Sequence, residues 1–292
     1  MSDTSPVSTP ISAGVLIMPT NFDIMRNAIP AEPAAAASAP PVAENTVATD
    51  VMTVSVSFLT DSEQLEAMLP PGKHLSIHGP PVVTVSAVYQ GGLAWLAGRG
   101  YNLILVALPV VHTGRTGQTV GRFLPVVWEN MAEPILVGRE TLGWPKIYAD
   151  LPPVRRLNDS CQCLAAWHGF TFAEMAVTGL RPLAPAELQA RAANTAPSAG
   201  LICHKFILRT GSWTETDADY LTLSGSDGAR APVVREVLTG KAGVRFNSAS
   251  WAELPTMTHI VNRLADLEIR EVYDATVFSQ SGGSMGTTRI LD

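Results

Sequence analysis

The chain has 292 residues, of which 46% are hydrophobic and only 16% are charged, and its formal net charge is −6. This length suits one large domain or two small ones, and the low charge predicts extensive burial, including burial at a subunit interface. An acidic chain without a basic stripe has little with which to neutralise phosphates, which excludes nucleic acid as its main partner.

The first 48 residues are rich in Ala, Pro, Ser and Thr, which predicts a flexible arm with one short apolar patch at residues 15–18. No basic region precedes an apolar core at the N-terminus, so no secretory signal is expected. The longest strongly apolar run, residues 103–111, is too short to span a bilayer. We therefore expect a cytoplasmic protein that has no membrane partner.

Strands dominate the predicted elements of the following domain, residues 49–279. Residues 51–58 alternate with period two, as a half-buried strand does, and the capping box from Thr60 to Glu63 predicts a short helix that ends before Pro70. Further strands are predicted over residues 82–88, 103–111, 123–128, 163–177, 201–209, 233–238 and 268–278. A helix is predicted over residues 185–193, and residues 256–264 suit either a helix or a strand. The pattern indicates an α+β fold, mainly antiparallel β, followed by a flexible Ser- and Gly-rich tail over residues 280–292.

The chain has three cysteines, Cys161, Cys163 and Cys203. An odd and sparse set suits a reducing compartment and not a disulfide framework. Cys161 and Cys163, together with Cys203 and the adjacent His204, lack the usual spacing of zinc ligands. We therefore expect buried thiols, no metal site and no cofactor.

Lys146 is the most informative single residue, because only four of the 20 basic residues are lysines and this one has apolar or aromatic neighbours. These neighbours are Trp144, Pro145, Ile147 and Tyr148. Burial disfavours the charged form of an amine, so a lysine that must be neutral to attack a carbonyl gains from such surroundings. The alternative is a lysine whose stem lies on apolar surface while its ammonium reaches water.

The segment that leads to this lysine is Glu133-Pro-Ile-Leu-Val-Gly-Arg-Glu-Thr-Leu-Gly-Trp-Pro-Lys146. It resembles the active-site signature of acetoacetate decarboxylases, in which Glu-Pro, Gly-Arg-Glu and aromatic-Pro-Lys end on a Schiff-base lysine. Weaker similarity covers residues 50–278. The resemblance implies a cone-like or barrel-like fold with few helices, in which Lys146 points into an internal pocket, and a homo-oligomeric assembly.

The chain departs from the family pattern at several positions. Family decarboxylases follow the reactive lysine with a second lysine, whose place is taken here by Ile147. Their two pocket carboxylates align with Ser86 and with Gly98 or Arg99, and their pocket arginine aligns near Val51. The resemblance therefore implies that the nucleophile is retained while the groups that handle a β-keto acid are changed.

The chemistry expected of such a lysine begins with a protonated imine, which acts as an electron sink. The imine supports loss of carbon dioxide from a β-keto acid. It equally supports enamine formation from pyruvate, aldol addition to an aldehyde and dehydration, which require a general acid/base. The missing carboxylates favour a Schiff-base lyase of the pyruvate aldolase–dehydratase type, with a small keto acid and an aldehyde as partners. The alternatives are an acetoacetate decarboxylase and a non-catalytic protein that binds a small ligand.

The candidate site residues follow from this interpretation. Lys146 is predicted to be catalytic, and Glu253 is a candidate proton carrier, with a solvent-facing glutamate as the alternative. Arg139 and Glu140 are expected to pair and so to position the lysine turn. Four residues are predicted to contact substrate: Trp144, Arg99, Arg122 and Tyr89. Both of these arginines equally suit surface or ion-pair roles, and Tyr101 and Tyr148 are further candidates.

Overall fold

The protein is described by a computed structural model that covers residues 50–194, 198–225, 227, 229–283 and 286–292. The predicted N-terminal arm over residues 1–48, including its apolar patch, lies outside these residues. Fourteen strands form one sheet in the part that is covered. They are β1 (Asp50–Leu59), β2 (Leu75–Ile77), β3 (Val82–Leu93), β4 (Arg99–Gly114), β5 (Gly117–Glu129), β6 (Lys146–Tyr148), β7 (Arg155–Leu157), β8 (Ser160–Trp167), β9 (Phe170–Pro182), β10 (Gly200–Leu208), β11 (Thr216–Gly225), β12 (Val233–Phe246), β13 (Glu271–Ser281) and β14 (Thr288–Ile290).

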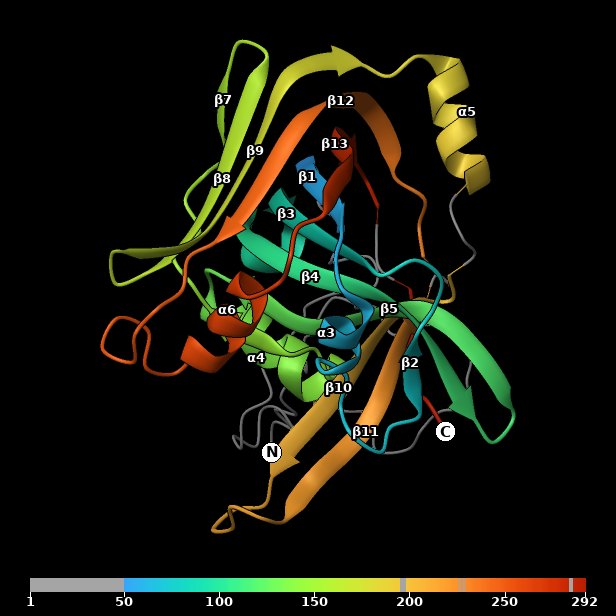
Figure 1. Ribbon diagram of the computed structural model, residues 1–292, viewed down its shortest axis with the longest axis vertical. Helices are drawn as coiled ribbons and strands as arrows, with labels where there is room; N and C mark the ends of the chain where they lie inside the picture. Colours follow the sequence, from blue (N-terminus) through green and yellow to red (C-terminus); the bar gives the residue numbers. More distant parts are fainter. Residues whose placement is uncertain (1–49, 195–197, 226, 228, 284–285) are drawn as a thin grey trace, which may run out of the picture.

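The α-helices within the described ranges are short: α3 (Ser62–Glu66), α4 (Ala132–Val137), α5 (Pro185–Asn194) and α6 (Thr258–Ala265) (Figure 1). The fold is therefore α+β and mainly antiparallel β, as the sequence predicts. None of these described helices combines the length and the hydrophobicity needed to cross a bilayer.

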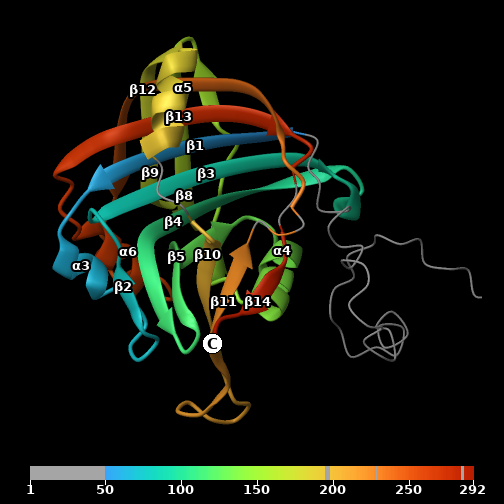
Figure 2. The ribbon, with the colours of Figure 1, turned by 90° about the vertical axis from the view of Figure 1, so that its right-hand side faces the viewer.

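The strand order is β14-β11-β10-β5-β4-β3-β1-β13-β12-β9-β8-β7, with β2 on β4 and β6 on β5. The pairs of β5 with β10 and with β6 are parallel, and the other pairs are antiparallel. Figure 2 shows that β12, β13, β1, β3 and β4 lie one above another, while β10, β11 and β14 run steeply beneath them. The sheet is strongly curved, but the hydrogen bonds among the described strands leave it open between β14 and β7.

The position of the lysine strand β6 is set by its pairing with one edge of β5. Strand β4 pairs with β5 along its length, from Gly117 to Glu129. The other edge is divided: β10 pairs near Arg122 and Phe123, and β6 pairs from Val127 to Glu129. The lysine strand β6 and strand β10 therefore meet at the same edge.

Several expected elements differ in the structure. The single strand predicted over residues 163–177 is wrong, because β8 and β9 form a hairpin whose turn holds His168 and Gly169 at positive φ. Residues 256–264, ambiguous in sequence, are mostly the helix α6. The N-cap of α3 is Asp61 and not Thr60, since the Asp61 carboxylate accepts hydrogen bonds from the backbone N–H groups of Glu63 and Gln64.

The flexible tail predicted over residues 280–292 is also wrong for its described part. Strand β13 extends to Ser281, and β14 pairs with β11 from Thr288 to Ile290. Leu291 is buried, with 7% of its surface exposed. The pairing of β14 with the edge of β11 and the burial of Leu291 therefore order this segment in spite of its Gly- and Ser-rich composition.

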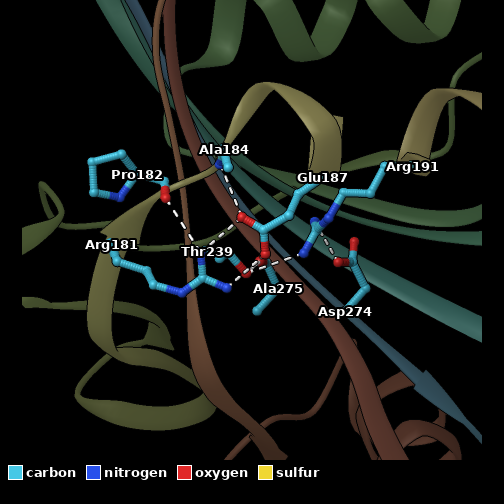
Figure 3. A network of polar contacts seen from close by, with 8 residues as sticks. All are labelled: Arg181, Pro182, Ala184, Glu187, Arg191, Thr239, Asp274 and Ala275. Atoms are coloured by element: carbon cyan, nitrogen blue, oxygen red, sulfur yellow. Dashed lines mark hydrogen bonds and ion pairs between the residues drawn. The ribbon is translucent and has the colours of Figure 1, made fainter. Parts of the chain in front are cut away.

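Helix α5 is tied to its surroundings by polar contacts (Figure 3). The guanidinium of Arg181 forms two hydrogen bonds with the carboxylate of Glu187, at 2.7 and 2.9 Å, and the Ala184 N–H donates to the same carboxylate. Arg191 donates to Thr239 Oγ1 of β12 and lies 2.5 Å from Asp274 Oδ1 of β13. These contacts join the helix to the adjacent strands.

The two faces of the central strands carry separate apolar clusters. The larger cluster, here called the main core, includes Trp128, Phe172 and Val261 of α6. The smaller one, the lysine-side cluster, is built from buried side chains of β4, β5, β10 and the lysine segment. These are Leu103, Ala107, Leu124, Val127, Trp144 and Cys203. Side chains alternate along a strand, so Val127 and Trp128 point to opposite clusters.

Candidate active site

Lys146 is the first residue of β6 and pairs with Val127 of β5, which places it in the lysine-side cluster. Its side chain is 6% exposed, so the alternative in which the ammonium reaches water does not describe this structure. Lys146 Nζ donates a hydrogen bond to the Pro134 carbonyl at 3.1 Å. It also lies 5.2 Å from the ring centroid of Trp144 and 5.9 Å from that of Tyr101. Both distances are in the range of cation–π contacts.

Glu129, the last residue of β5, lies beside Lys146, a neighbour that the sequence did not indicate. Its side chain has no exposed surface, and Oε1 lies 2.7 Å from Lys146 Nζ. Glu129 lies two residues after Val127 and so points to the same face of the sheet. Oε2 is buried and has no hydrogen-bond partner among the residues that the structure covers. Burial raises the pKa of the Glu129 carboxyl above its ordinary value, while the positive charge of Lys146 acts in the opposite direction.

The Gly-Arg-Glu part of the signature forms a π-helical turn over Gly138–Leu142 that covers the lysine side chain. A Cβ at Gly138 would lie 2.5 Å from Lys146 Cδ and Cε and 2.8 Å from Nζ, so a larger residue there would displace the end of the lysine side chain. Gly143 has φ 74° and ends the turn in the left-handed region. The glycines of the signature therefore allow the backbone to close over the lysine.

Arg139 and Glu140 act separately and do not form an ion pair with each other. Arg139 Nη1 donates to the backbone carbonyl of Lys146 at 3.0 Å. Glu140 contributes its backbone carbonyl, which accepts a hydrogen bond from Lys205 Nζ at 2.7 Å. The geometry supports a positioning role for Arg139, whereas the expected pairing with Glu140 is wrong because the Arg139 guanidinium is engaged by the backbone carbonyl of Lys146.

Trp144 is buried, and its indole is hydrogen-bonded to a residue of strand β11. Its Nε1 donates to Ser224 Oγ of β11 at 3.0 Å, and this hydroxyl lies 2.9 Å from Thr288 Oγ1 of β14. Thr222 Oγ1, also on β11, donates to the Leu142 carbonyl at 2.8 Å. Strands β11 and β14 therefore fix the aromatic residue that lies beside the lysine.

The tyrosines are divided by strand alternation. Tyr101 of β4 lies beside Lys146, and burial, with a smaller effect of the Glu129 charge, raises the pKa of its phenol. Tyr89, predicted to contact substrate, instead packs against the main core near Cys163. Tyr148 is half-exposed and its hydroxyl donates to Asp150 Oδ1 at 2.8 Å. Tyr101, and not Tyr89, is therefore the tyrosine that lies beside Lys146.

Three other predicted residues lie outside the buried group. Arg99 and Arg122 are exposed, and Arg99 Nη1 donates to the Leu96 carbonyl at 3.4 Å. Glu253 is exposed, and its carboxylate accepts hydrogen bonds from the backbone N–H and Oγ of Ser250, both at 2.8 Å. These bonds lower the pKa of the Glu253 carboxyl and tie it to its own turn.

The structure also locates two residues at which the chain departs from the decarboxylase pattern, Ser86 and Ile147. Ser86 Oγ lies 2.8 Å from Ser55 Oγ on the neighbouring strand β1. Ile147 packs against the main core, on the face opposite to Lys146. Strand alternation therefore turns the residue after the lysine away from Nζ.

The three cysteines are buried free thiols. Burial raises the pKa of all three, to about 12 for Cys163. The described residues contain no group of three or more His, Cys, Asp or Glu side chains arranged to hold a metal ion.

An open surface groove of about 580 Å³ lies beside β6. Its walls are formed by Asn130, Tyr148, Asp150, Leu151, Pro152, Leu164, Ala166, Gly169 and Thr171. Lys146 is not among these residues. The lysine is enclosed by the lysine-side cluster and the π-helical turn.

Comparison with known proteins adds a family match. A family model described as acetoacetate decarboxylase (ADC) matches residues 28–291. A search of curated protein sequences found no match.

Solved structures provide further relatives. An acetoacetate decarboxylase from Legionella pneumophila subsp. pneumophila str. Philadelphia 1 is 16% identical, covers 94% of this chain and 98% of its own, and superposes with a TM-score of 0.65. The enduracididine biosynthesis enzyme MppR, complexed with the condensation product of pyruvate and imidazole 4-carboxaldehyde, is 17% identical, with coverage of 83% and 88% and a TM-score of 0.61. An acetoacetate decarboxylase-like enzyme from Sphingomonas wittichii RW1 is 20% identical, with coverage of 83% and 91% and a TM-score of 0.61. At these identities the likeness concerns the fold.

Proposed function

Because the chain belongs to the acetoacetate decarboxylase family, we propose that it is a lyase that forms a Schiff base between Lys146 and a small keto acid. The reaction we favour is of the pyruvate aldolase–dehydratase type, in which the enamine of pyruvate adds to an aldehyde and water is then lost. The observation that carries the proposal is the buried Nζ of Lys146 beside the carboxyl of Glu129. Burial of a charged amine costs free energy, and buried titratable groups are concentrated at functional sites.

The surroundings of Lys146 suit an imine. Its Nζ lies within 6 Å of the rings of Trp144 and Tyr101, whose faces stabilise a positive charge on nitrogen both before and after condensation. The apolar side chains of the lysine-side cluster keep bulk water away from the nitrogen. A protonated imine held there draws electrons from the adjacent carbon, which permits enamine formation.

Related structures and the aligned carboxylate positions bear on the choice between the two lyase reactions. The complex of MppR with a pyruvate condensation product supports the aldolase–dehydratase type, since that enzyme shares the fold. Acetoacetate decarboxylation is the second candidate, supported by the family match and by the Legionella structure. The positions aligned with the decarboxylase carboxylates, Ser86 and Gly98 or Arg99, carry no carboxylate here, which favours the first.

Borohydride reduction tests the proposal directly. The protein is incubated with pyruvate or with acetoacetate, reduced, and examined by intact-mass and peptide mass spectrometry. We expect one reduced adduct, mapped to Lys146, that is lost in Lys146→Ala. The matched control is Lys241→Ala, which removes an exposed lysine of β12 and should retain the adduct. Absence of an adduct on the wild-type protein, or its persistence in Lys146→Ala, contradicts the proposal.

Product analysis then separates the two reactions. Release of carbon dioxide from acetoacetate identifies a decarboxylase. An absorbing enone formed from pyruvate and an aldehyde identifies an aldolase–dehydratase. An adduct without either product identifies a binding protein that forms the imine and does not turn over.

A further inference from the structure

The Glu129 carboxyl lies beside Lys146, and the Schiff-base proposal assigns it no chemical role. Its side chain has no exposed surface, and its two oxygens have different surroundings. Oε1 lies 2.7 Å from Lys146 Nζ. Oε2 has no hydrogen-bond partner within the described part of the chain. One oxygen therefore contacts the nucleophile, and the other is available to a second group.

A purely structural ion pair gives a poor account of this arrangement. Burying two charges costs as much free energy as their attraction returns in many proteins, and apolar residues of similar size often stabilise a core equally well. The unpartnered Oε2 adds the cost of a buried acceptor without a donor. Stability alone therefore does not explain a fully buried glutamate that lies opposite Leu103 on the neighbouring strand.

We infer that Glu129 is the general base and general acid of Schiff-base formation: it takes a proton from Lys146 and delivers protons to the oxygen that leaves the substrate. This inference rests on the proposed function, because it assigns a role within the same reaction. It places the proton carrier inside the buried group and replaces the exposed Glu253 as the candidate.

The proton transfers balance within the pair. The Glu129 carboxylate first takes a proton from the Lys146 ammonium, which leaves a neutral amine and a neutral carboxyl. The amine nitrogen bonds to the carbonyl carbon, the carbon–oxygen π bond breaks, and the carboxyl protonates the resulting alkoxide. The nitrogen, now positive, returns a proton to the carboxylate to give a neutral carbinolamine. The carboxyl then protonates the hydroxyl, the carbon–oxygen bond breaks, and water leaves. The products are a protonated imine and the Glu129 carboxylate beside it.

The other titratable groups that face this pair are less suited to the role. Tyr101 approaches from β4, and Cys203 approaches from β10. Burial raises the pKa of the Tyr101 phenol and of the Cys203 thiol, so both hold their protons at neutral pH. Burial raises the pKa of the Glu129 carboxyl above its ordinary value, which favours uptake of a proton from the neighbouring amine.

Rates of adduct formation test the inference. The protein is mixed with pyruvate, samples are reduced with borohydride at intervals, and the fraction modified at Lys146 is measured across the pH range in which the protein is folded. Glu129→Gln keeps the shape of the side chain and removes its ability to carry a proton. We expect this variant to form the adduct about 10²-fold more slowly and to lose the pH dependence caused by the carboxyl. The matched control is Glu271→Gln, an exposed glutamate of β13, which should behave as the wild-type protein does.

A second variant decides the matter if Glu129→Gln does not fold, as judged by loss of a cooperative thermal transition. Glu129→Asp keeps the charge and withdraws the carboxyl from Nζ by one methylene. A group that only balances charge would leave the rate unchanged in this variant. A proton carrier must reach its partner, so we expect adduct formation to slow at least tenfold.

The outcomes separate the two hypotheses. Adduct formation by the wild-type protein, together with unchanged rates and pH profiles in folded Glu129 variants, overturns the role of Glu129 and leaves the Schiff base standing. Absence of any adduct on the wild-type protein overturns the Schiff base and, with it, the role of Glu129.

Discussion

The indole Nε1 of Trp144 donates a hydrogen bond to Ser224 Oγ at 3.0 Å, and both side chains are buried. The bond joins the lysine segment to β11, a strand 80 residues further along the chain. Through Thr288, the same hydroxyl contacts the C-terminal strand β14. The residue that packs beside Lys146 is therefore held by the last part of the chain.

Ser224→Ala should weaken both the fold and the site. Removal of the hydroxyl leaves the Trp144 N–H buried without an acceptor, which costs about 1–3 kcal/mol. We expect the free energy of unfolding to fall by this amount in chemical denaturation, and adduct formation at Lys146 to slow. Ser76→Ala, which removes an exposed hydroxyl of β2, is the control and should change the free energy of unfolding by less than about 0.5 kcal/mol. Equal effects of the two substitutions would contradict the importance of this bond.

Gly138→Ala should displace the lysine. Alanine favours a helical turn more than glycine does by about 1 kcal/mol, so any harm comes from the contact between its Cβ and the Lys146 side chain. Such overpacking costs about 1–3 kcal/mol, and we expect adduct formation to slow at least tenfold. In contrast, a Cβ at Gly243 of β12 meets no atom within 4 Å, so Gly243→Ala should retain the wild-type rate. Stopped-time borohydride trapping measures both variants.

Leu291→Ala should destabilise the protein although it lies next to the C-terminus. Leu291 is 7% exposed, whereas its neighbour Ile290 is 53% exposed. We expect Leu291→Ala to lower the free energy of unfolding by about 2 kcal/mol, and Ile290→Ala to lower it by less than about 0.5 kcal/mol. Thermal and chemical unfolding measure the difference. A flexible tail would instead make both substitutions neutral.

Acid should weaken the attachment of α5 through Glu187. Its hydrogen bonds with Arg181, and then the Ala184 N–H, lower the pKa of this carboxyl from 4.5 to about 2 (Figure 3). A lowered pKa contributes stability that is present above pH 4.5 and is lost as the pH falls through about 2. The difference in unfolding free energy between wild type and Glu187→Gln should therefore shrink as the pH falls over this interval. Denaturation at a series of pH values tests this, with Glu271→Gln as the exposed control. A difference that does not change with pH would contradict the assignment.

The central strands and the lysine segment could be predicted from the sequence. Period-two alternation located the central strands, and the Gly-Arg-Glu and Trp-Pro-Lys motifs singled out Lys146 and Trp144, because each of these signals lies within a short segment. The glycine in the signature is explained by the same segment, since the turn it forms folds back on the lysine that follows.

The tertiary structure decided which distant groups meet that lysine. Glu129 reaches Nζ because β6 pairs with β5 in the register that sets Lys146 opposite Val127, and no local pattern fixes the register between two strands joined by a helix and a turn. Strand alternation also places Tyr101 on the face of the sheet that carries the lysine-side cluster and Tyr89 on the face that carries the main core. A shift of either strand by one residue would exchange the faces, so the sequence alone did not distinguish the two tyrosines. Strand β14 forms because β11 offers it an edge. Local sequence thus determined the position of Lys146, the proposed nucleophile, and of the turn beside it, whereas strand pairing over long distances placed the Glu129 carboxyl next to it.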